Sequence, residues 1–216
     1  MSYNYRQHLL GMFYALLNNT APEIGSRLHY TGYFAGFPKY KFYTHNLLPT
    51  NAAYNPEGMV SLNNDWEYWF ATADPQVLAI IEHSTSLLNV LSFGNHTLAI
   101  KKVTRIPLRK NGGLFRCVAP ITIKRQRQNG YLTPDDPDFE AAVVTSLKNR
   151  YRAWTGRETT VEFRFIEPRR RLEHYRQGKI LSFSGKIFLQ ATQDVIQFAQ
   201  LVGLGQKNSL GMGMIT

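Results

Sequence analysis

The spacing of apolar residues along this chain changes between helical and extended in an order that occurs twice. Residues 5–18 place Leu9 and Phe13 four positions apart among other apolar residues, which is typical of an amphipathic helix. Asp74 and Pro75 are typical of an N-cap and the first helical position. In the first half, the pattern predicts helices over 5–18 and 75–91, strands over 28–48, 58–71 and 96–108, and a turn-rich loop in NLLPTNAAYNPEG.

The second half predicts a strand, a helix, two strands, a helix and a last strand. These elements are a strand over 113–124, a helix from Asp135–Asp138 to about Trp154, strands over 159–167 and 180–191, a helix from Thr192 to Val202, and a short strand in GMGMIT. That order is the complete βαββαβ unit of a ferredoxin-like module. We therefore predict an α+β fold with tandem ferredoxin-like (RRM-like) modules over 1–110 and 111–216, the first lacking its opening strand.

Without an opening strand in the first module, the neighbouring strand lacks a partner for its backbone hydrogen bonds. Only residues 1–4 precede the first predicted helix, which is too few for a strand in the interior of a sheet. Unpaired backbone groups beside a strand are costly when they are buried. The alternatives are a truncated or unusual form of the chain, a larger assembly, or a fused upstream domain that supplies the pairing.

Positive charge is concentrated in two blocks. Lys and Arg number 25 and Asp and Glu 15, so the net charge is 25 − 15 = +10, and no acidic residue lies between Glu82 and Asp135. The second block follows Pro168 and contains one acidic residue, Glu173. Solvated faces are the ordinary explanation of such runs, but two blocks with this little compensation favour a polyanion, and we expect nucleic acid. The candidate contacts in these blocks are Lys124, Arg125, Arg127, Arg169, Arg170 and Arg171, and the three-arginine run is expected between two strands.

Several classes of protein are disfavoured. A single cysteine, Cys117, rules out an intrachain disulfide framework and a cysteine-based zinc site. No apolar run is long enough for a membrane span, and MSYNYRQ lacks the layout of a signal peptide, so we expect a cytoplasmic protein without a membrane partner. The HExxH, GxxxxGK[ST] and GxSxG motifs are missing, and we predict neither a metal nor a cofactor.

The chain ends in an unusual glycine-rich segment, GLGQKNSLGMGMI. Glycine tolerates positive φ angles and lets a phosphate approach the backbone, and polar side chains between the glycines add hydrogen-bond donors. Single glycine pairs mostly indicate turns, whereas four glycines around KNS are more specific. The candidate RNA contacts here are Gly203, Gly205, Lys207, Asn208, Ser209, Gly211 and Gly213.

GLGQKNSLGMGMI resembles the glycine-rich signature of the CRISPR-associated RAMP superfamily, specifically the Cas6 endoribonucleases that cut CRISPR repeat RNA. The resemblance implies a metal-independent ribonuclease in which the ribose 2′-OH attacks the adjacent phosphodiester. The products are a 2′,3′-cyclic phosphate and a 5′-OH, and the processed RNA is guide crRNA. This chemistry needs groups that move protons and a cation for the crowded phosphorane.

The resemblance also implies the catalytic residues. Members of the family carry a histidine just after the first helix, and some place a tyrosine on that helix. In this sequence the pattern falls on His29 and Tyr14, with Lys41 on the following strand as the cation and Lys39 as the second choice. His45 and His8 are weaker candidates for the histidine, Tyr14 is equally consistent with a core aromatic, and Lys41 with a solvated strand face.

Two classes of function therefore remain. The leading hypothesis is an endoribonuclease that cuts CRISPR precursor RNA at each repeat. The alternative is a non-catalytic subunit that holds crRNA in an effector complex with other Cas proteins. A general tandem RNA-recognition protein is a weaker third possibility, because the chain lacks an aromatic strand of the form KGFGFVxF.

Overall fold

The computed structural model describes residues 4–33, 40–55, 58–126 and 129–216. The first half contains α1 (Arg6–Thr20), α2 (Pro22–Tyr30), β1 (Tyr43–Pro49), β2 (Ala52–Asn55), β3 (Gly58–Ser61), β4 (Trp66–Thr72), α3 (Pro75–Leu87), β5 (Val90–Phe93) and β6 (His96–Ala99). The second contains β7 (Gly113–Arg116), α4 (Phe139–Thr155), β8 (Glu162–Phe165), β9 (Arg169–Tyr175), β10 (Gly178–Ser184), β11 (Lys186–Gln190), α5 (Gln193–Val202) and the 3-10 turn η1 (Asn208–Leu210).

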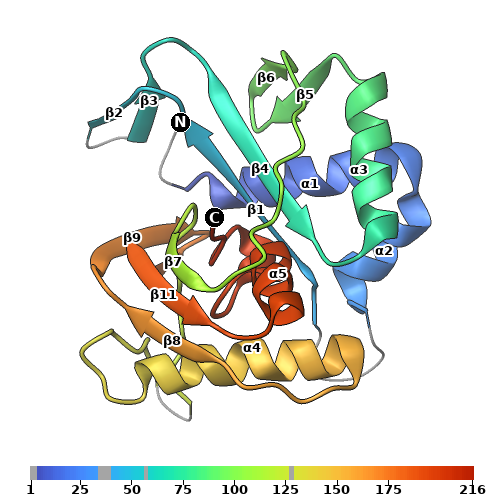
Figure 1. The fold of residues 1–216 in the computed structure, drawn as a ribbon. Coiled ribbons are helices and arrows are strands. Elements are labelled where there is room, and N and C mark those ends of the chain that lie inside the picture. Colours follow the sequence, from blue (N-terminus) through green and yellow to red (C-terminus); the bar gives the residue numbers. More distant parts are fainter. Residues whose placement is uncertain (1–3, 34–39, 56–57, 127–128) are drawn as a thin grey trace.

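A long antiparallel ribbon of β1 and β4 forms the centre of the first half (Figure 1). Its register places Tyr43 opposite Thr72 and Pro49 opposite Trp66. The helices α1, α2 and α3 pack together with Tyr43 in one apolar cluster. At the start of α3 the Asp74 carboxylate accepts hydrogen bonds from the backbone N–H groups of Gln76 and Val77, so the predicted N-cap is confirmed.

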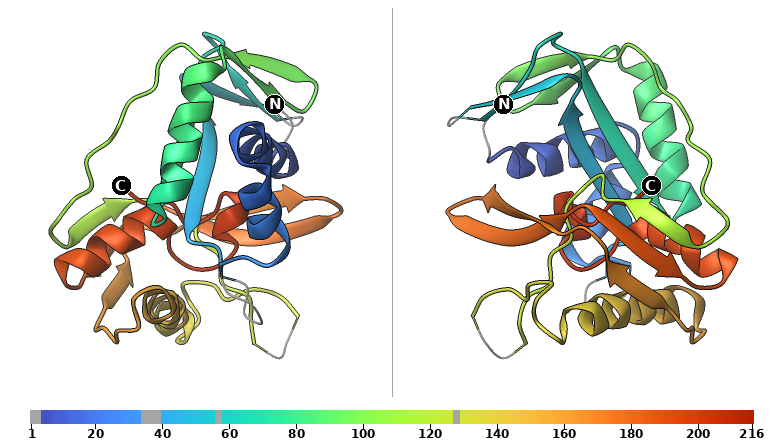
Figure 2. Two further views of the ribbon diagram at one scale, coloured as in Figure 1. Left: turned by 90° about the vertical axis from the view of Figure 1, so that its right-hand side faces the viewer. Right: turned by 60° about the vertical axis from the view of Figure 1, so that its left-hand side comes forward.

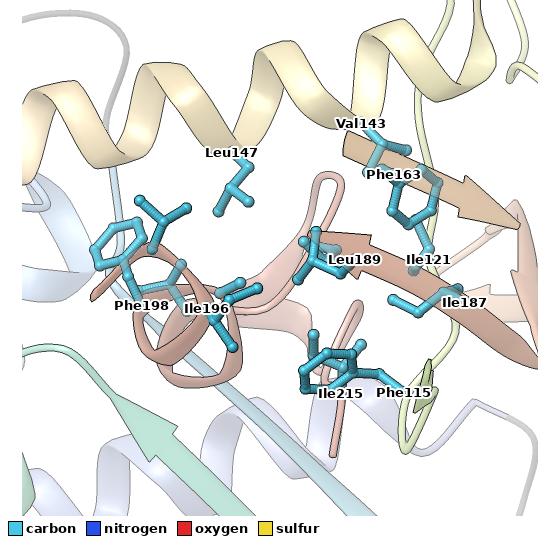
Figure 3. Packing of buried hydrophobic residues seen from close by; sticks show 14 of the residues in the cluster. Phe115, Ile121, Val143, Leu147, Phe163, Ile187, Leu189, Ile196, Phe198 and Ile215 are labelled. Atoms are coloured by element: carbon cyan, nitrogen blue, oxygen red, sulfur yellow. The ribbon is translucent and has the colours of Figure 1, made fainter. Parts of the chain in front are cut away.

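The second half is a three-stranded sheet covered by two helices. Its strand order is β7-β11-β8, and Cys117 beyond β7 forms an isolated antiparallel bridge to Ile215. Figure 3 shows Val143 and Leu147 of α4 pointing toward this sheet, where they meet Leu189 of β11. Ile196 of α5 joins the same cluster, so a single core fills the space between both helices and the sheet.

The hairpin of β9 and β10 projects from the body of the protein (Figure 2). It carries the three consecutive arginines, Arg169 to Arg171, on β9 itself. The prediction that this run lies between two strands is therefore wrong. The predicted single strand over 180–191 is also divided, because Gly185 has a φ of 143° and a Cβ there would lie 1.9 Å from the carbonyl oxygen of Glu167.

Some elements of the first half also differ from the prediction. Residues 28–30 end the helix α2, where Pro22 occupies the first turn and Leu28 is fully buried, and the strand begins only at Tyr43. The predicted turn-rich loop contains the end of β1 and the strand β2. The helix predicted over 75–91 ends at Leu87, and residues 90–99 form the hairpin of β5 and β6, which turns at Gly94 with a φ of 59°. Residues 100–108 continue without regular structure.

The glycine-rich C-terminal segment lies between the two halves (Figure 1). The backbone N–H of Leu204 donates to the Gly213 carbonyl, and that of Gly213 donates to the Pro120 carbonyl, each at 2.8 Å. From the first half, the Thr44 hydroxyl donates to the Met212 carbonyl at 3.0 Å. The segment therefore joins the N-terminal ribbon to the C-terminal sheet.

Replacing Gly213 by alanine is expected to destabilise the protein strongly. Gly213 has a φ of 74°, and an added Cβ would lie 1.9 Å from the carbonyl oxygen of Leu204, so backbone has to move. The positive φ alone costs roughly 1–2 kcal/mol for an L-residue. Denaturant unfolding should show a loss larger than this.

Gly11→Ala is the matched control, because Gly11 lies on the exposed side of α1 and an added Cβ there meets no atom within 4 Å. Alanine in a helix interior should stabilise this variant by up to about 1 kcal/mol. Equal effects of the two substitutions would contradict the close packing of the segment.

Candidate active site and RNA-binding surfaces

The structure brings His29, Tyr14 and Lys41 together from three parts of the chain: Tyr14 lies on α1, His29 on α2 and Lys41 two residues before β1. The prediction that Lys41 lies on the strand itself is therefore wrong. The Lys41 Nζ atom donates a hydrogen bond of 3.0 Å to the Tyr14 hydroxyl and lies 5.5 Å from the centroid of the Tyr14 ring. The His29 ring meets the same tyrosine edge-on, with centroids 5.0 Å apart and an interplanar angle of 75°. We call these three residues the α1–α2 cluster.

Local folding explains how the α1–α2 cluster forms. Tyr14 is buried on the inner face of α1, where its hydroxyl also lies 3.2 Å from that of Tyr43 at the start of β1. Leu28 anchors α2 in the core, so its neighbour His29 points outward and is exposed. The cluster thus combines an exposed imidazole, a half-buried ammonium and a hydroxyl that fixes the ammonium, which suits proton transfer beside an anion.

The other candidate histidines lie elsewhere. His45 is fully buried in β1, with Nε2 3.0 Å from the Ser209 carbonyl oxygen and Nδ1 3.1 Å from the Tyr68 hydroxyl. Because a carbonyl only accepts, Nε2 carries the proton, and Nδ1 accepts from Tyr68. His8 is exposed on α1 and contacts Phe93. Lys39 lies outside the described residues.

The four glycines of the C-terminal segment are buried and are surrounded by protein atoms. A Cβ at Gly205 would lie 2.7 Å from the Thr122 carbonyl oxygen, and one at Gly211 would lie 2.7 Å from that of His45. A Cβ at Gly203 would lie 2.7 Å from Asn208 Nδ2, and one at Gly213 would lie 1.9 Å from the Leu204 carbonyl oxygen. Internal packing therefore explains the glycines, in place of the close approach of a phosphate that we expected.

Asn208 belongs to the same internal network. Its side-chain amide donates to the carbonyl oxygens of Leu204 and Met212 and accepts from Arg150. Lys207 and Ser209 remain half-buried at the surface, and burial, followed by the neighbouring Lys124, lowers the pKa of Lys207. In the C-terminal segment, the contact of Lys207 and Ser209 with RNA remains a prediction.

Two buried arginines that sequence analysis did not single out hold this segment. Arg6 of α1 donates to the carbonyl oxygens of Leu210 and Gly211 and forms an ion pair of 3.0 Å with Glu173 on β9.

Arg150 of α4 donates to the carbonyl oxygens of Val202 and Gly203, and burial lowers its pKa to about 10. Its place in the sequence is a signal that could have been used, because Arg150 follows Val143 and Leu147 on the apolar side of the helix.

The remaining candidate RNA contacts lie on two surfaces. Arg169, Arg170 and Arg171 are exposed on β9, and Arg171 Nε donates to the Ser184 hydroxyl at 3.1 Å. Lys124 is exposed, whereas Arg125 is paired with Asp136 at 2.7 Å. Arg127 lies outside the described residues.

The described residues contain no group of three or more His, Cys, Asp or Glu side chains that could hold a metal ion. None of their helices is both long and apolar enough to cross a membrane.

The family model of CRISPR associated protein Cas6, C-terminal, matches residues 102–216. The chain belongs to the Cas6 family. It is 24% identical over 227 residues to the CRISPR-associated endoribonuclease Cas6 1 of Methanocaldococcus jannaschii, with 99% of this chain and 85% of that protein covered. It is 22% identical over 222 residues to the CRISPR-associated endoribonuclease Cas6 of Pyrococcus furiosus, with 99% and 82% covered.

The similarity in fold, like the similarity in sequence, extends over the whole chain. A solved structure of an RAMP protein binding different RNA substrates superimposes with a TM-score of 0.84 at 16% identity, over 100% of this chain and 92% of that one. The mixed α+β fold therefore matches over the whole chain.

The buried His45 should make the stability of this Cas6 protein depend on pH. Burial lowers the pKa of His45 to about 4 from its ordinary 6.5. Between these values the unfolded chain binds more protons than the folded one, so the free energy of unfolding falls as the pH drops from about 6.5 to about 4. The contribution of His45 to this loss is on the order of 3 kcal/mol.

Denaturant unfolding of wild type and His45→Gln at pH 7 and pH 5 measures the effect. The variant should lose less stability on acidification than the wild type, and His96→Gln, an exposed strand histidine, should behave like the wild type. A difference between wild type and His45→Gln that stays constant across this range would mean that the imidazole is not buried in its neutral form.

Proposed function

We propose that this protein is an endoribonuclease that cleaves CRISPR precursor RNA within the repeats and yields guide crRNA. The proposed reaction is a metal-independent attack of the 2′-OH that leaves a 2′,3′-cyclic phosphate and a 5′-OH. The observation that carries the proposal is the α1–α2 cluster, in which His29, Tyr14 and Lys41 meet although up to 27 residues separate them in sequence.

The relatives support the substrate class. Both are named as CRISPR-associated endoribonucleases, and the similar structure is of an RAMP protein that binds RNA. The net charge of +10 suits a phosphate backbone. We infer that CRISPR repeat RNA is the substrate, and that other Cas proteins of an effector complex are further partners.

In this reaction each member of the α1–α2 cluster has a role. The exposed His29 imidazole accepts the proton of the 2′-OH while the 2′-oxygen bonds to phosphorus. The bond between phosphorus and the 5′-oxygen breaks, that oxygen takes a proton from water, and the exposed His29 returns its proton to the solvent. The Lys41 ammonium stabilises the negative charge that develops on the phosphate oxygens, and the Tyr14 hydroxyl, which accepts from Lys41, holds this cation in place.

We propose that the projecting β9–β10 hairpin binds the repeat through Arg169, Arg170 and Arg171. Glu173, the acidic residue of this block, is turned toward the buried Arg6, so it does not oppose the arginines at the surface. Lys124 and Lys207 extend the positive surface at the C-terminal segment. Contacts of this kind should weaken steeply with added salt.

We also propose that the two halves are ferredoxin-like modules divided near residue 110. The order β7-β11-β8, together with the Cys117–Ile215 bridge, supports such a module in the second half. The described part of the first half starts with α1, and the C-terminal segment lies against β1 through Thr44 and His45. The chain's own C-terminal segment therefore packs against part of β1.

Replacing His29 by alanine should abolish cleavage while leaving RNA binding intact. We expect the single-turnover rate on repeat RNA in EDTA to fall by roughly 10²- to 10⁴-fold, the usual contribution of a general acid or base. The dissociation constant should change little, because an imidazole at this site supplies proton transfer and not the main phosphate contacts.

His83→Ala is the matched control, since His83 is an exposed histidine on the helix α3. RNA with a single 2′-deoxy nucleotide at the cleavage site should bind and remain uncut. A wild-type protein that binds repeat RNA tightly without cutting it would instead favour a non-catalytic crRNA-binding subunit.

A further inference from the structure

We propose that Tyr30 forms a nucleobase subsite beside His29, which stacks the base of the nucleotide on the 5′ side of the scissile phosphate. The inference rests on the proposed function and names a specific contact for it. Tyr30 is the last residue of α2 and the most exposed large apolar side chain in the described part of the chain, at 69%.

Contact with the α1–α2 cluster distinguishes Tyr30 from an ordinary exposed tyrosine, because a scattered surface aromatic needs no explanation. The rings of Tyr30 and His29 lie edge to face, with centroids 4.6 Å apart and an interplanar angle of 75°. His29 therefore contacts both the buried Tyr14 and the exposed Tyr30. An RNA placed with a ribose at His29 puts the attached base close to the Tyr30 ring.

The backbone beneath Tyr30 is fixed, as a stacking platform requires. The Arg27 carbonyl accepts from the Thr31 N–H at 2.9 Å, from the Gly32 N–H at 3.1 Å and from the Thr31 hydroxyl at 2.8 Å. Leu28 holds the same turn in the core with no exposed surface. Little ordering of the protein is therefore needed when a base stacks there.

Charge at this helix end favours RNA as the ligand. Arg27 lies in the last turn of α2, where its positive charge offsets the negative end of the helix dipole. Arg27 is exposed and precedes Tyr30 by three positions, so both lie on one side of the helix. A cation and an aromatic ring side by side bind a phosphate and its base, a combination used for single-stranded nucleic acid.

The test uses RNA that cannot be cleaved, so that binding is measured separately from catalysis. Repeat RNA with a single 2′-deoxy nucleotide at the cleavage site is prepared with an abasic site at each unpaired position in turn. Dissociation constants for these RNAs are measured with wild type, Tyr30→Ala and Tyr30→Phe. Tyr30→Ala should bind the intact RNA roughly 5- to 150-fold more weakly, the range found for loss of one base–aromatic stack. Tyr30→Phe should retain wild-type affinity.

Non-additivity identifies the base. One abasic position should weaken the wild type and Tyr30→Phe but have no further effect on Tyr30→Ala, and this position should be the nucleotide 5′ of the mapped cut. Leu87→Ala, which removes a side chain 60% exposed at the end of α3, should bind like the wild type.

Two outcomes would overturn the subsite: unchanged affinity of Tyr30→Ala, or losses that add at every abasic position. Failure of the proposed function gives a different result. A wild type that does not cut normal RNA can still show one abasic position that weakens its own binding and has no further effect on Tyr30→Ala.

Discussion

The arrangement of the whole molecule depends on two buried arginines, one from each half, that bind the carbonyl oxygens of the C-terminal segment. Arg6 reaches Leu210 and Gly211 from α1, and Arg150 reaches Val202 and Gly203 from α4. A guanidinium is tolerated in a protein interior only when its N–H groups are paired, and backbone carbonyls left free by a glycine-rich turn provide such partners. The segment thus joins the two halves, and its glycines make the close approach possible.

Arg6 also connects this joint to both functional surfaces. Its ion pair with Glu173 ties α1 to the basic hairpin, and Tyr14 lies eight residues further along the same helix, about 12 Å away at 1.5 Å per residue. Removing Glu173 would leave the buried Arg6 charge without its carboxylate partner, a change that typically costs about 3–5 kcal/mol. The hairpin that we propose to grip the repeat and the cluster that we propose to cut it are therefore placed by one rigid element.

Signals in the sequence were sufficient to predict features that depend only on neighbouring residues. Asp74 marks the start of α3, and the family resemblance led to three residues that the fold does bring together. Long-range packing was not predictable in the same way. Residues 28–30 look extended beside a Tyr-rich run, yet burial of Leu28 makes them the end of α2. The break at Gly185 is set by the Glu167 carbonyl, and the pairing of Arg6 with Glu173 spans 167 residues.

The chemical identity of the new RNA ends tests the central claim most directly. Mass spectrometry of the fragments made from repeat RNA reads both ends at the cut. A 2′,3′-cyclic phosphate on the upstream fragment and a 5′-OH on the downstream fragment are expected if the ribose attacks its own phosphate at the α1–α2 cluster. A 3′-OH with a 5′-phosphate would show that water attacks instead, and would contradict the roles given to His29, Tyr14 and Lys41.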